Sequence, residues 1–401
     1  MSDGVPRREG EFRDWLWLAC SIAIPLPWIV MHGAETPPAP EVVAALSGVA
    51  ILGAAFLLSW ATELAEKDIP QSLALLVLGL VSVLPEYAVD LSFAIRAAED
   101  PTYAQYAVAN MTGANRLLIG LGWASVVLLA CRRSRATALN LPPGRTLELR
   151  FLLWATLYSF LIPLDGRLSL LDGGLLIALF AAYAFSAARG YSEEIELIGP
   201  PARIEARFGD PGRRLCALAL FVFAGFAIWV AAEPFAESLV EVGRRTSIDE
   251  FLLVQWVAPL ASESPEFMIA LLFAYRMRGE VGLGALISSK VNQWTLLVGA
   301  LPIAYCIAAG TLGGLVLTSR QTGELWLTSA QSLFAVLVVA DRVFRVWEAV
   351  AIAGIFVVQL VFPSSEVRTA FTWLYLVLFV GLLVHSPERR RAMWRLLNPR
   401  N

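Results

Sequence analysis

The feature that most constrains this chain is a succession of long apolar stretches separated by short segments rich in charge, proline or glycine. A helix of about 20 apolar residues crosses the hydrocarbon core of a membrane. Charged residues make up only 16% of the sequence, whereas soluble domains contain about 25%. We therefore predict an all-α polytopic membrane protein with about twelve transmembrane helices. The loops leave no room for a separate catalytic or nucleic-acid-binding domain.

The apolar stretches define twelve expected spans along the chain. They are 15–32, 42–64, 71–95, 104–130, 150–164, 168–188, 215–240, 250–275, 281–309, 326–341, 346–363 and 369–385. Lysine and arginine accumulate at the cytoplasmic ends of spans. With the N-terminus inside, twenty-three basic residues fall on the cytoplasmic side and six on the outer side. We expect a multi-pass protein of the cell membrane with both termini in the cytoplasm.

Two segments share an unusual pattern inside apolar helices. Residues 82–87 read Ser-Val-Leu-Pro-Glu-Tyr, and residues 262–267 read Ser-Glu-Ser-Pro-Glu-Phe. In the next helix of each half, Asn115 and Asn292 each precede a glycine by seven residues. Matched features in the same order indicate an internal duplication.

The two Pro-Glu helices are predicted to run in opposite directions, because an odd number of spans separates Glu86 from Glu266. Inverted repeats are typical of secondary transporters, whose substrate site lies near the midplane beside broken helices. Pro85 and Pro265 each remove a backbone hydrogen bond next to a carboxylate. A carboxylate at that depth beside freed carbonyl oxygens indicates a cation site.

This repeated pattern resembles that of the calcium:cation antiporter superfamily, which includes the sodium/calcium exchanger membrane region and the calcium/proton exchangers. The resemblance covers about residues 42–363 and implies two inverted five-helix repeats with one extra helix at each end. The implied organisation is a cytoplasmic N-terminus and extra helix in 1–41, a first repeat in 42–188, a cytoplasmic loop in 189–214, a second repeat in 215–363, and an extra helix with a basic cytoplasmic C-terminus in 364–401.

The same resemblance implies which residues bind the ion. Glu86 and Glu266 would be the paired carboxylates that bind the metal ion. The neighbouring polar positions of the site would be Ser82, Ser262, Asn110, Asn115, Ser289 and Asn292. Carboxylate, hydroxyl and amide oxygens are ligands from which Ca2+ builds its shell of six to eight oxygens.

Two further carboxylates are expected to modulate this site. Asp90 follows Glu86 by four residues, and Glu263 precedes Glu266 by three. Each therefore shares a helical face with its partner. Protonation of any of these carboxylates would change the net charge of the site.

Two basic residues fall inside expected spans, and both are expected to modulate the site. Lys290 has two interpretations: a built-in cation that occupies part of the site, or a structural ion pair to Glu263 or Asp90. Arg116 is expected to pair with a nearby acid or with main-chain carbonyls.

We expect a secondary active antiporter that exchanges Ca2+ or another cation for Na+ or H+ by alternating access, without a cofactor. Two alternatives remain open, a monovalent Na+/H+ antiporter and a transport-inactive relative that acts as a sensor or assembly subunit. The expected partners are the lipid bilayer and small inorganic cations, with no nucleic acid and no evident soluble protein. The two histidines and four scattered cysteines do not indicate a zinc site or a hydrolase, so we expect no enzyme.

Overall fold

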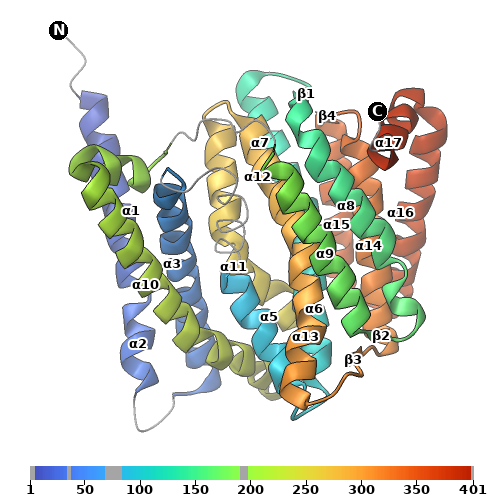
Figure 1. The fold of residues 1–401 in the computed structure, drawn as a ribbon, viewed down its shortest axis with the longest axis horizontal. Coiled ribbons are helices and arrows are strands. Elements are labelled where there is room, and N and C mark those ends of the chain that lie inside the picture. The colour runs from blue at the N-terminus through green and yellow to red at the C-terminus, as the bar shows by residue number, and fades with distance from the viewer. Residues whose placement is uncertain (1–4, 34–37, 68–83, 190–196, 399–401) are drawn as a thin grey trace. The chain divides into compact units, whose positions relative to one another are not determined.

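The structure is a computed structural model that describes residues 5–33, 38–67, 84–189 and 197–398, and most of these are helical (Figure 1). The elements before residue 190 are α1 (Val5–Ala23), α2 (Leu26–His32), α3 (Pro40–Glu66), α5 (Leu84–Arg96), α6 (Tyr103–Leu117), η1 (Leu118–Trp123), α7 (Ala124–Ser134), β1 (Ala138–Asn140), η2 (Pro143–Arg145), α8 (Thr146–Ser159), η3 (Ile162–Leu164), β2 (Arg167–Leu168) and α9 (Leu170–Ala187).

The second half of the chain repeats this alternation of helices and very short strands. Its elements are α10 (Pro200–Thr246), α11 (Glu250–Tyr275), α12 (Gly279–Asn292), η4 (Gln293–Leu297), α13 (Val298–Ala309), β3 (Leu315–Val316), α14 (Ser319–Val339), β4 (Val343–Arg345), α15 (Val346–Val361), α16 (Ser365–His385) and α17 (Pro387–Leu397).

The helices have the length and composition of membrane spans. Within the described ranges, nine helices are long and apolar enough to cross a membrane, and α11 adds a tenth if its two bent segments form one broken span. Each expected span coincides with a helix, except that most of 71–95 lies outside the described residues and only its end is seen as α5. The prediction of an all-α polytopic membrane protein is confirmed.

Several predicted boundaries need correction. The first expected span is two helices, because Pro25 lies between α1 and α2 and does not continue the first. The expected loop 189–214 is helical from Pro200 onward, with a kink at Gly209, whose φ is 62°. Helix α14 begins at Ser319 rather than at 326, because Thr318 and Gln321 form a capping box there.

The chain divides into two compact units, and each takes equivalent parts of both repeats. Unit 1 comprises Met1–Ser92 and Ala187–Pro265, and unit 2 comprises Phe93–Ser186 and Glu266–Asn401. Unit 1 therefore contains α3 and α10, the first helices of the two repeats, and the beginnings of the Pro-Glu helices α5 and α11. Unit 2 contains the third, fourth and fifth helices of both repeats, together with α16 and α17.

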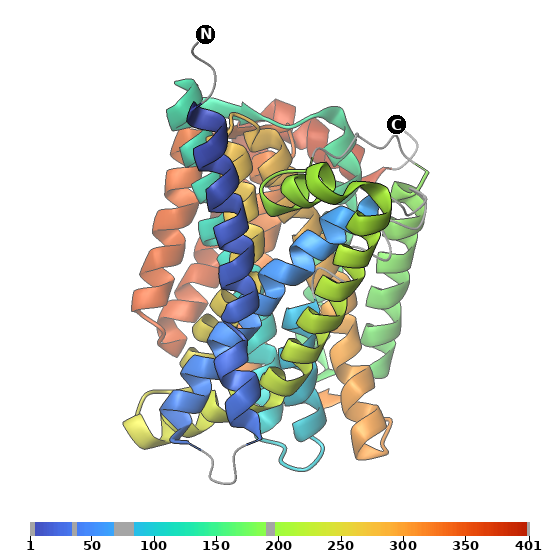
Figure 2. The ribbon, with the colours of Figure 1, turned by 90° about the vertical axis from the view of Figure 1, so that its left-hand side faces the viewer.

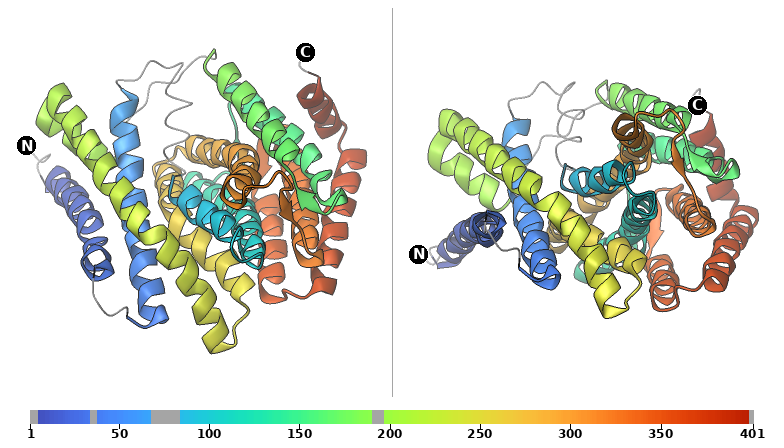
Figure 3. Two further views of the ribbon diagram at one scale, coloured as in Figure 1. Left: turned by 60° about the horizontal axis from the view of Figure 1, so that its bottom comes forward. Right: turned by 90° about the horizontal axis from the view of Figure 1, so that it is seen from below.

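Unit 1 is built around the packing of α3 along α10 (Figures 2 and 3). Apolar side chains from both helices, such as Leu57 and Ala224, form its buried core. Gly48 allows close packing, since a Cβ atom there would lie 2.7 Å from the ring of Phe235. The extra N-terminal helices attach to α10, where Trp28 Nε1 donates a hydrogen bond to the main-chain oxygen of Val230 at 3.0 Å.

In unit 2, elements of one repeat pack on elements of the other in a reciprocal way. Helix α6 packs on α14, and its counterpart α12 packs on α8. Strand β1 pairs antiparallel with β4, and β2 with β3, and the two pairs lie at opposite ends of unit 2 (Figure 1). The third helix of each repeat thus packs on the fourth helix of the other repeat. Such paired contacts are expected when two copies of one unit are related by an inverted duplication.

Candidate functional site

The third helix of each repeat changes from α to π geometry just after its asparagine. Asn115 lies in α6, three residues before the π-helix η1 (Leu118–Trp123). Asn292 is the last residue of α12, and the π-helix η4 (Gln293–Leu297) follows it directly. Short π-helices are rare and often mark functional sites. The duplication seen in the sequence therefore extends to an uncommon backbone feature.

The glycines that follow these asparagines are positions of close packing in unit 2. A Cβ atom at Gly122 would lie 2.8 Å from the ring of Phe267. A Cβ atom at Gly299 would lie 2.9 Å from the main-chain oxygen of Gly173, so α13 approaches α9 backbone to backbone. In each repeat, a buried asparagine is thus followed seven residues later by a glycine at which another element packs closely.

The carboxylate of Glu266 is held by a hydroxyl group from the third helix of its own repeat. Glu266 begins the second segment of α11, directly after Pro265. Ser289 in α12 donates a hydrogen bond from Oγ to Oε2 of Glu266 at 2.5 Å, and both side chains are partly buried. Asn292 is buried three residues further along α12, on the same helical face as Ser289. Two residues predicted from the resemblance are thereby brought together.

Lys290, the next residue of α12, is fully buried and contacts Asn115 of the other repeat. Its Nζ donates to Oδ1 of Asn115 at 2.6 Å and to the main-chain oxygen of Asn115 at 3.1 Å. The ammonium also lies 4.6 Å from the centre of the Trp294 ring, within cation–π distance. Asn110, another predicted site residue, is buried in the same helix as Asn115.

Arg116 belongs to a buried ion-pair network in unit 2. Its Nη2 lies 2.6 Å from Oε2 of Glu324 in α14, and Nε of Arg368 in α16 lies 2.8 Å from Oε1 of the same carboxylate. All three side chains are buried. The expected pairing of Arg116 with an acid is found, and the extra C-terminal helix supplies a second arginine that the sequence pattern did not indicate.

The remaining predicted residues belong to unit 1. Glu86 and Asp90 are both buried and lie one turn apart on α5. Ser262 and Glu263 are buried in α11, where Ser262 Oγ donates to the main-chain oxygen of Ala258 at 3.2 Å. Ser82 lies outside the described residues.

The chemistry available for a metal ion is that of oxygen ligands. In the part of the chain that the structure describes, no three His, Cys, Asp or Glu side chains come together as a metal site. Ser289 and Asn292 offer a hydroxyl and an amide oxygen on one face of α12, and Ca2+ accepts such oxygens as well as carboxylates.

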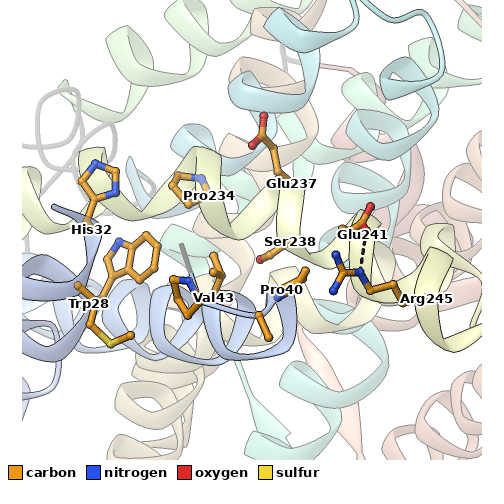
Figure 4. Close-up of a pocket in the computed structure, with 12 residues that line it drawn as sticks. Trp28, His32, Pro40, Val43, Pro234, Glu237, Ser238, Glu241 and Arg245 are labelled. Carbon is orange, nitrogen blue, oxygen red and sulfur yellow. Dashed lines mark hydrogen bonds and ion pairs between the residues drawn. The ribbon is translucent and has the colours of Figure 1, made fainter. Parts of the chain in front are cut away.

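Unit 1 also contains a cavity of about 630 Å³ where α2, α3 and α10 come close together (Figure 4). Trp28 and His32 line one end, and Glu241 and Arg245, which form an ion pair at 2.7 Å, line the other. None of the predicted ion-binding residues lines this cavity.

Sequence reasoning missed several charged residues that the fold pairs. Glu324 was not identified as a buried residue, because the expected span 326–341 begins two residues after it. Its position directly before an apolar stretch could have indicated that it lies within the helix. Arg389 of α17 was expected only as part of the basic cytoplasmic C-terminus, and the structure shows that it is buried and contacts Glu348 at 2.5 Å and Asp341 at 3.3 Å. The run of three arginines in this short terminal helix did not indicate which one is buried.

Comparisons with known proteins agree with the predicted resemblance. The family described as sodium/calcium exchanger protein matches residues 41–188 and 216–364. The crystal structure of the H+/Ca2+ exchanger CAX is 43% identical in sequence, covers 96% of this chain and 99% of its own, and has a TM-score of 0.90. A comparison with curated proteins gives no match.

More distant structures share the fold. The structure of native YfkE is 14% identical, covers 90% of this chain and 99% of its own, and has a TM-score of 0.60. The sodium-calcium exchanger NCX_Mj is 17% identical, covers 80% of this chain and 98% of its own, and has a TM-score of 0.53. The predicted fold of two inverted five-helix repeats is confirmed, as is the resemblance. The chain belongs to the sodium/calcium exchanger protein family, whose members are membrane ion exchangers and not enzymes.

Proposed function

We propose that this chain is a secondary active antiporter that moves Ca2+ across a membrane in exchange for H+. The observation that carries the proposal is its likeness along nearly the whole chain to an H+/Ca2+ exchanger, at 43% identity and a TM-score of 0.90. The pair formed by Glu266 and Ser289 supplies suitable chemistry, because a carboxylate can take up either a metal ion or a proton.

The ion-binding carboxylates in this proposal are Glu86 and Glu266, each directly after the proline of its repeat. The oxygens that complete the shell would come from Ser82, Ser262, Asn110, Asn115, Ser289 and Asn292. Asp90, Glu263, Lys290 and Arg116 would adjust the charge around the ion without binding it. In support, Glu86, Asn110 and Asn292 are buried, and their carboxylate and amide oxygens are ligands that Ca2+ accepts.

Exchange follows from competition for the same carboxylates. When Ca2+ leaves, protons neutralise the carboxylates. The charge of the site is therefore compensated by Ca2+ or by H+ while the site is closed off from water on both sides. Part of the repeat bundle then moves against the rest and opens the site to the other side.

The membrane orientation belongs to the same proposal. We propose a location in the cell membrane with both termini in the cytoplasm, because the basic residues concentrate at one side of the expected spans. The organisation into 1–41, 42–188, 189–214, 215–363 and 364–401 is proposed with it. The two segments that match the family, 41–188 and 216–364, support this organisation.

The test is Ca2+ uptake into proteoliposomes that contain the purified protein and an imposed pH gradient. We expect uptake driven by the gradient with the wild type, and loss of uptake in Glu86→Gln and Glu266→Gln. Glu99→Gln is the matched control, since Glu99 is exposed in the loop after α5 and should leave uptake unchanged. Full uptake in both site variants would refute the site. Exchange of Na+ for H+ without transport of Ca2+ would instead favour the monovalent antiporter. No transport of any cation would favour the transport-inactive relative.

A further inference from the structure

Lys290 is a buried cation whose ammonium group is held by two oxygen atoms of one residue. Its side chain is 0% exposed. The side-chain and main-chain oxygens of Asn115 lie 2.6 and 3.1 Å from its Nζ, and the face of Trp294 lies on a third side at 4.6 Å. The surroundings of this nitrogen are those of a bound cation.

Asn115 lies close to the change from α to π geometry. Asn115 donates from Nδ2 to the main-chain oxygen of Met111 at 2.8 Å, which fixes its amide group. The π-helix η1 begins three residues after Asn115, so the hydrogen-bond register of the helix changes close to this residue. Gln331 likewise places Nε2 3.4 Å from the main-chain oxygen of Arg116. Two successive carbonyls at this junction thus accept from side chains.

The same oxygens are suitable ligands for a small metal ion. Main-chain and amide oxygens are hard, neutral ligands that Na+ and Ca2+ share. Ser289, which holds the carboxylate of Glu266, directly precedes Lys290 in α12. The ammonium therefore lies on a pair of cation ligands, one residue away from a side chain of the proposed site.

We propose that Lys290 is a specificity-determining residue whose ammonium occupies, as a tethered cation, a position that Na+ would otherwise take on the oxygens of Asn115. The inference rests on the proposed function and deepens it. A resident ammonium excludes Na+ from these oxygens by occupancy, and it leaves the shell of Ca2+ to be completed by the other proposed oxygens. A proton needs no shell of oxygens and is not excluded, so the exchanger couples Ca2+ to H+ and not to Na+.

The alternative is a purely structural role, in which Lys290 links α12 to α6. Both roles predict that its loss lowers stability, so stability alone does not separate them. Only the specificity role predicts that loss of the ammonium creates a response to Na+. The test therefore measures Na+ binding directly.

The experiment uses the full chain with Lys290→Met, which removes the charge and keeps the length of the side chain, and Lys290→Arg, which keeps the charge. Thermal unfolding in detergent is followed while NaCl replaces choline chloride at constant ionic strength. We expect saturable stabilisation by Na+ in Lys290→Met and none in the wild type or in Lys290→Arg. Asn115→Ala added to Lys290→Met should abolish the response, because it removes one of the two oxygens.

Transport gives a second measurement. In vesicles with equal pH on both sides and an imposed Na+ gradient, Ca2+ flux in Lys290→Met should exceed that of the wild type about tenfold, which corresponds to about 1.4 kcal/mol of added cation binding. Stabilisation of the wild type by Na+, or a folded Lys290→Met that ignores Na+ in both measurements, would overturn the inference. If Lys290→Met does not fold, Lys290→Leu replaces it in both measurements. Stabilisation of the wild type by Na+ would still overturn the inference. Unfolding with Na+ requires no transport, so it tests Lys290 even if the wild type fails to exchange Ca2+ for H+.

Discussion

Replacing Glu324 by glutamine should be among the most destabilising single changes in unit 2. The carboxylate of Glu324 lies 2.6 Å from Nη2 of Arg116 and 2.8 Å from Nε of Arg368, and all three side chains are buried. Glu324→Gln keeps the shape of the side chain but removes its charge. Two buried guanidinium groups then remain beside a neutral amide.

The magnitude follows from the cost of breaking a buried pair. Loss of one partner from a buried ion pair costs about 3–5 kcal/mol, and Glu324→Gln uncouples two arginines at once. Arg368→Met leaves the pair of Arg116 and Glu324 in place, so it should cost less, about 1–3 kcal/mol. At about 2–4 °C per kcal/mol for chains of this order of size, Glu324→Gln should lower Tm by about 10 °C.

The assay is thermal unfolding of the purified protein in detergent at one fixed heating rate. Glu366→Gln is the matched control, because Glu366 is exposed in the first turn of α16, two residues from Arg368, and should lower Tm far less than Glu324→Gln. A Glu324→Gln protein that melts with the wild type, or an equal loss in the control, would show that the network contributes nothing specific.

Three other changes test different parts of the structure. Gly120→Ala should destabilise the protein by about 1–3 kcal/mol, because the new Cβ atom would lie 2.2 Å from Cγ of Phe356; Phe356→Leu should recover part of the loss of Tm, and a Gly120→Ala protein that melts normally contradicts the packing. Arg389→Gln should release α17, because it loses contacts to Glu348 and Asp341; faster cleavage of the C-terminal helix by trypsin is expected, and unchanged cleavage would count against it. Stabilisation by Ca2+ should weaken as pH falls, since protons and Ca2+ compete for the same carboxylates; a Ca2+-induced shift of Tm that is equal at mildly acidic and mildly alkaline pH argues against shared carboxylates.

Much of the fold could be predicted because a membrane reduces the choice of structures. Apolar stretches of sufficient length become helices, since every main-chain polar group must be satisfied within the segment. The duplication was visible because both Pro-Glu segments retained their order. Boundaries were less predictable: α14 begins at Ser319, where polar residues such as Arg320 and Gln321 resemble a loop. Capping at Thr318 and burial against other helices make this segment helical.

Only part of the candidate site could be predicted. The family resemblance indicated both Glu266 and Ser289, and the structure joins them by a hydrogen bond. The contact of the Lys290 ammonium with Asn115, which lies 175 positions away in the chain, was not indicated by any sequence pattern. The shift to π geometry after Asn115 has no signal in hydropathy.

The sequence by itself determined the class of the protein, the order of its helices, its inverted duplication and the carboxylates on its Pro-Glu helices. These follow from hydropathy, charge and repetition, which are properties of the chain read residue by residue. The tertiary structure alone decided the partners of the buried charges, Lys290 with Asn115 and Arg116 with Glu324 and Arg368. The hydropathy of the surrounding stretch indicates that a charged side chain lies within a membrane span. The packing of helices that are distant in sequence determines which atoms compensate its charge.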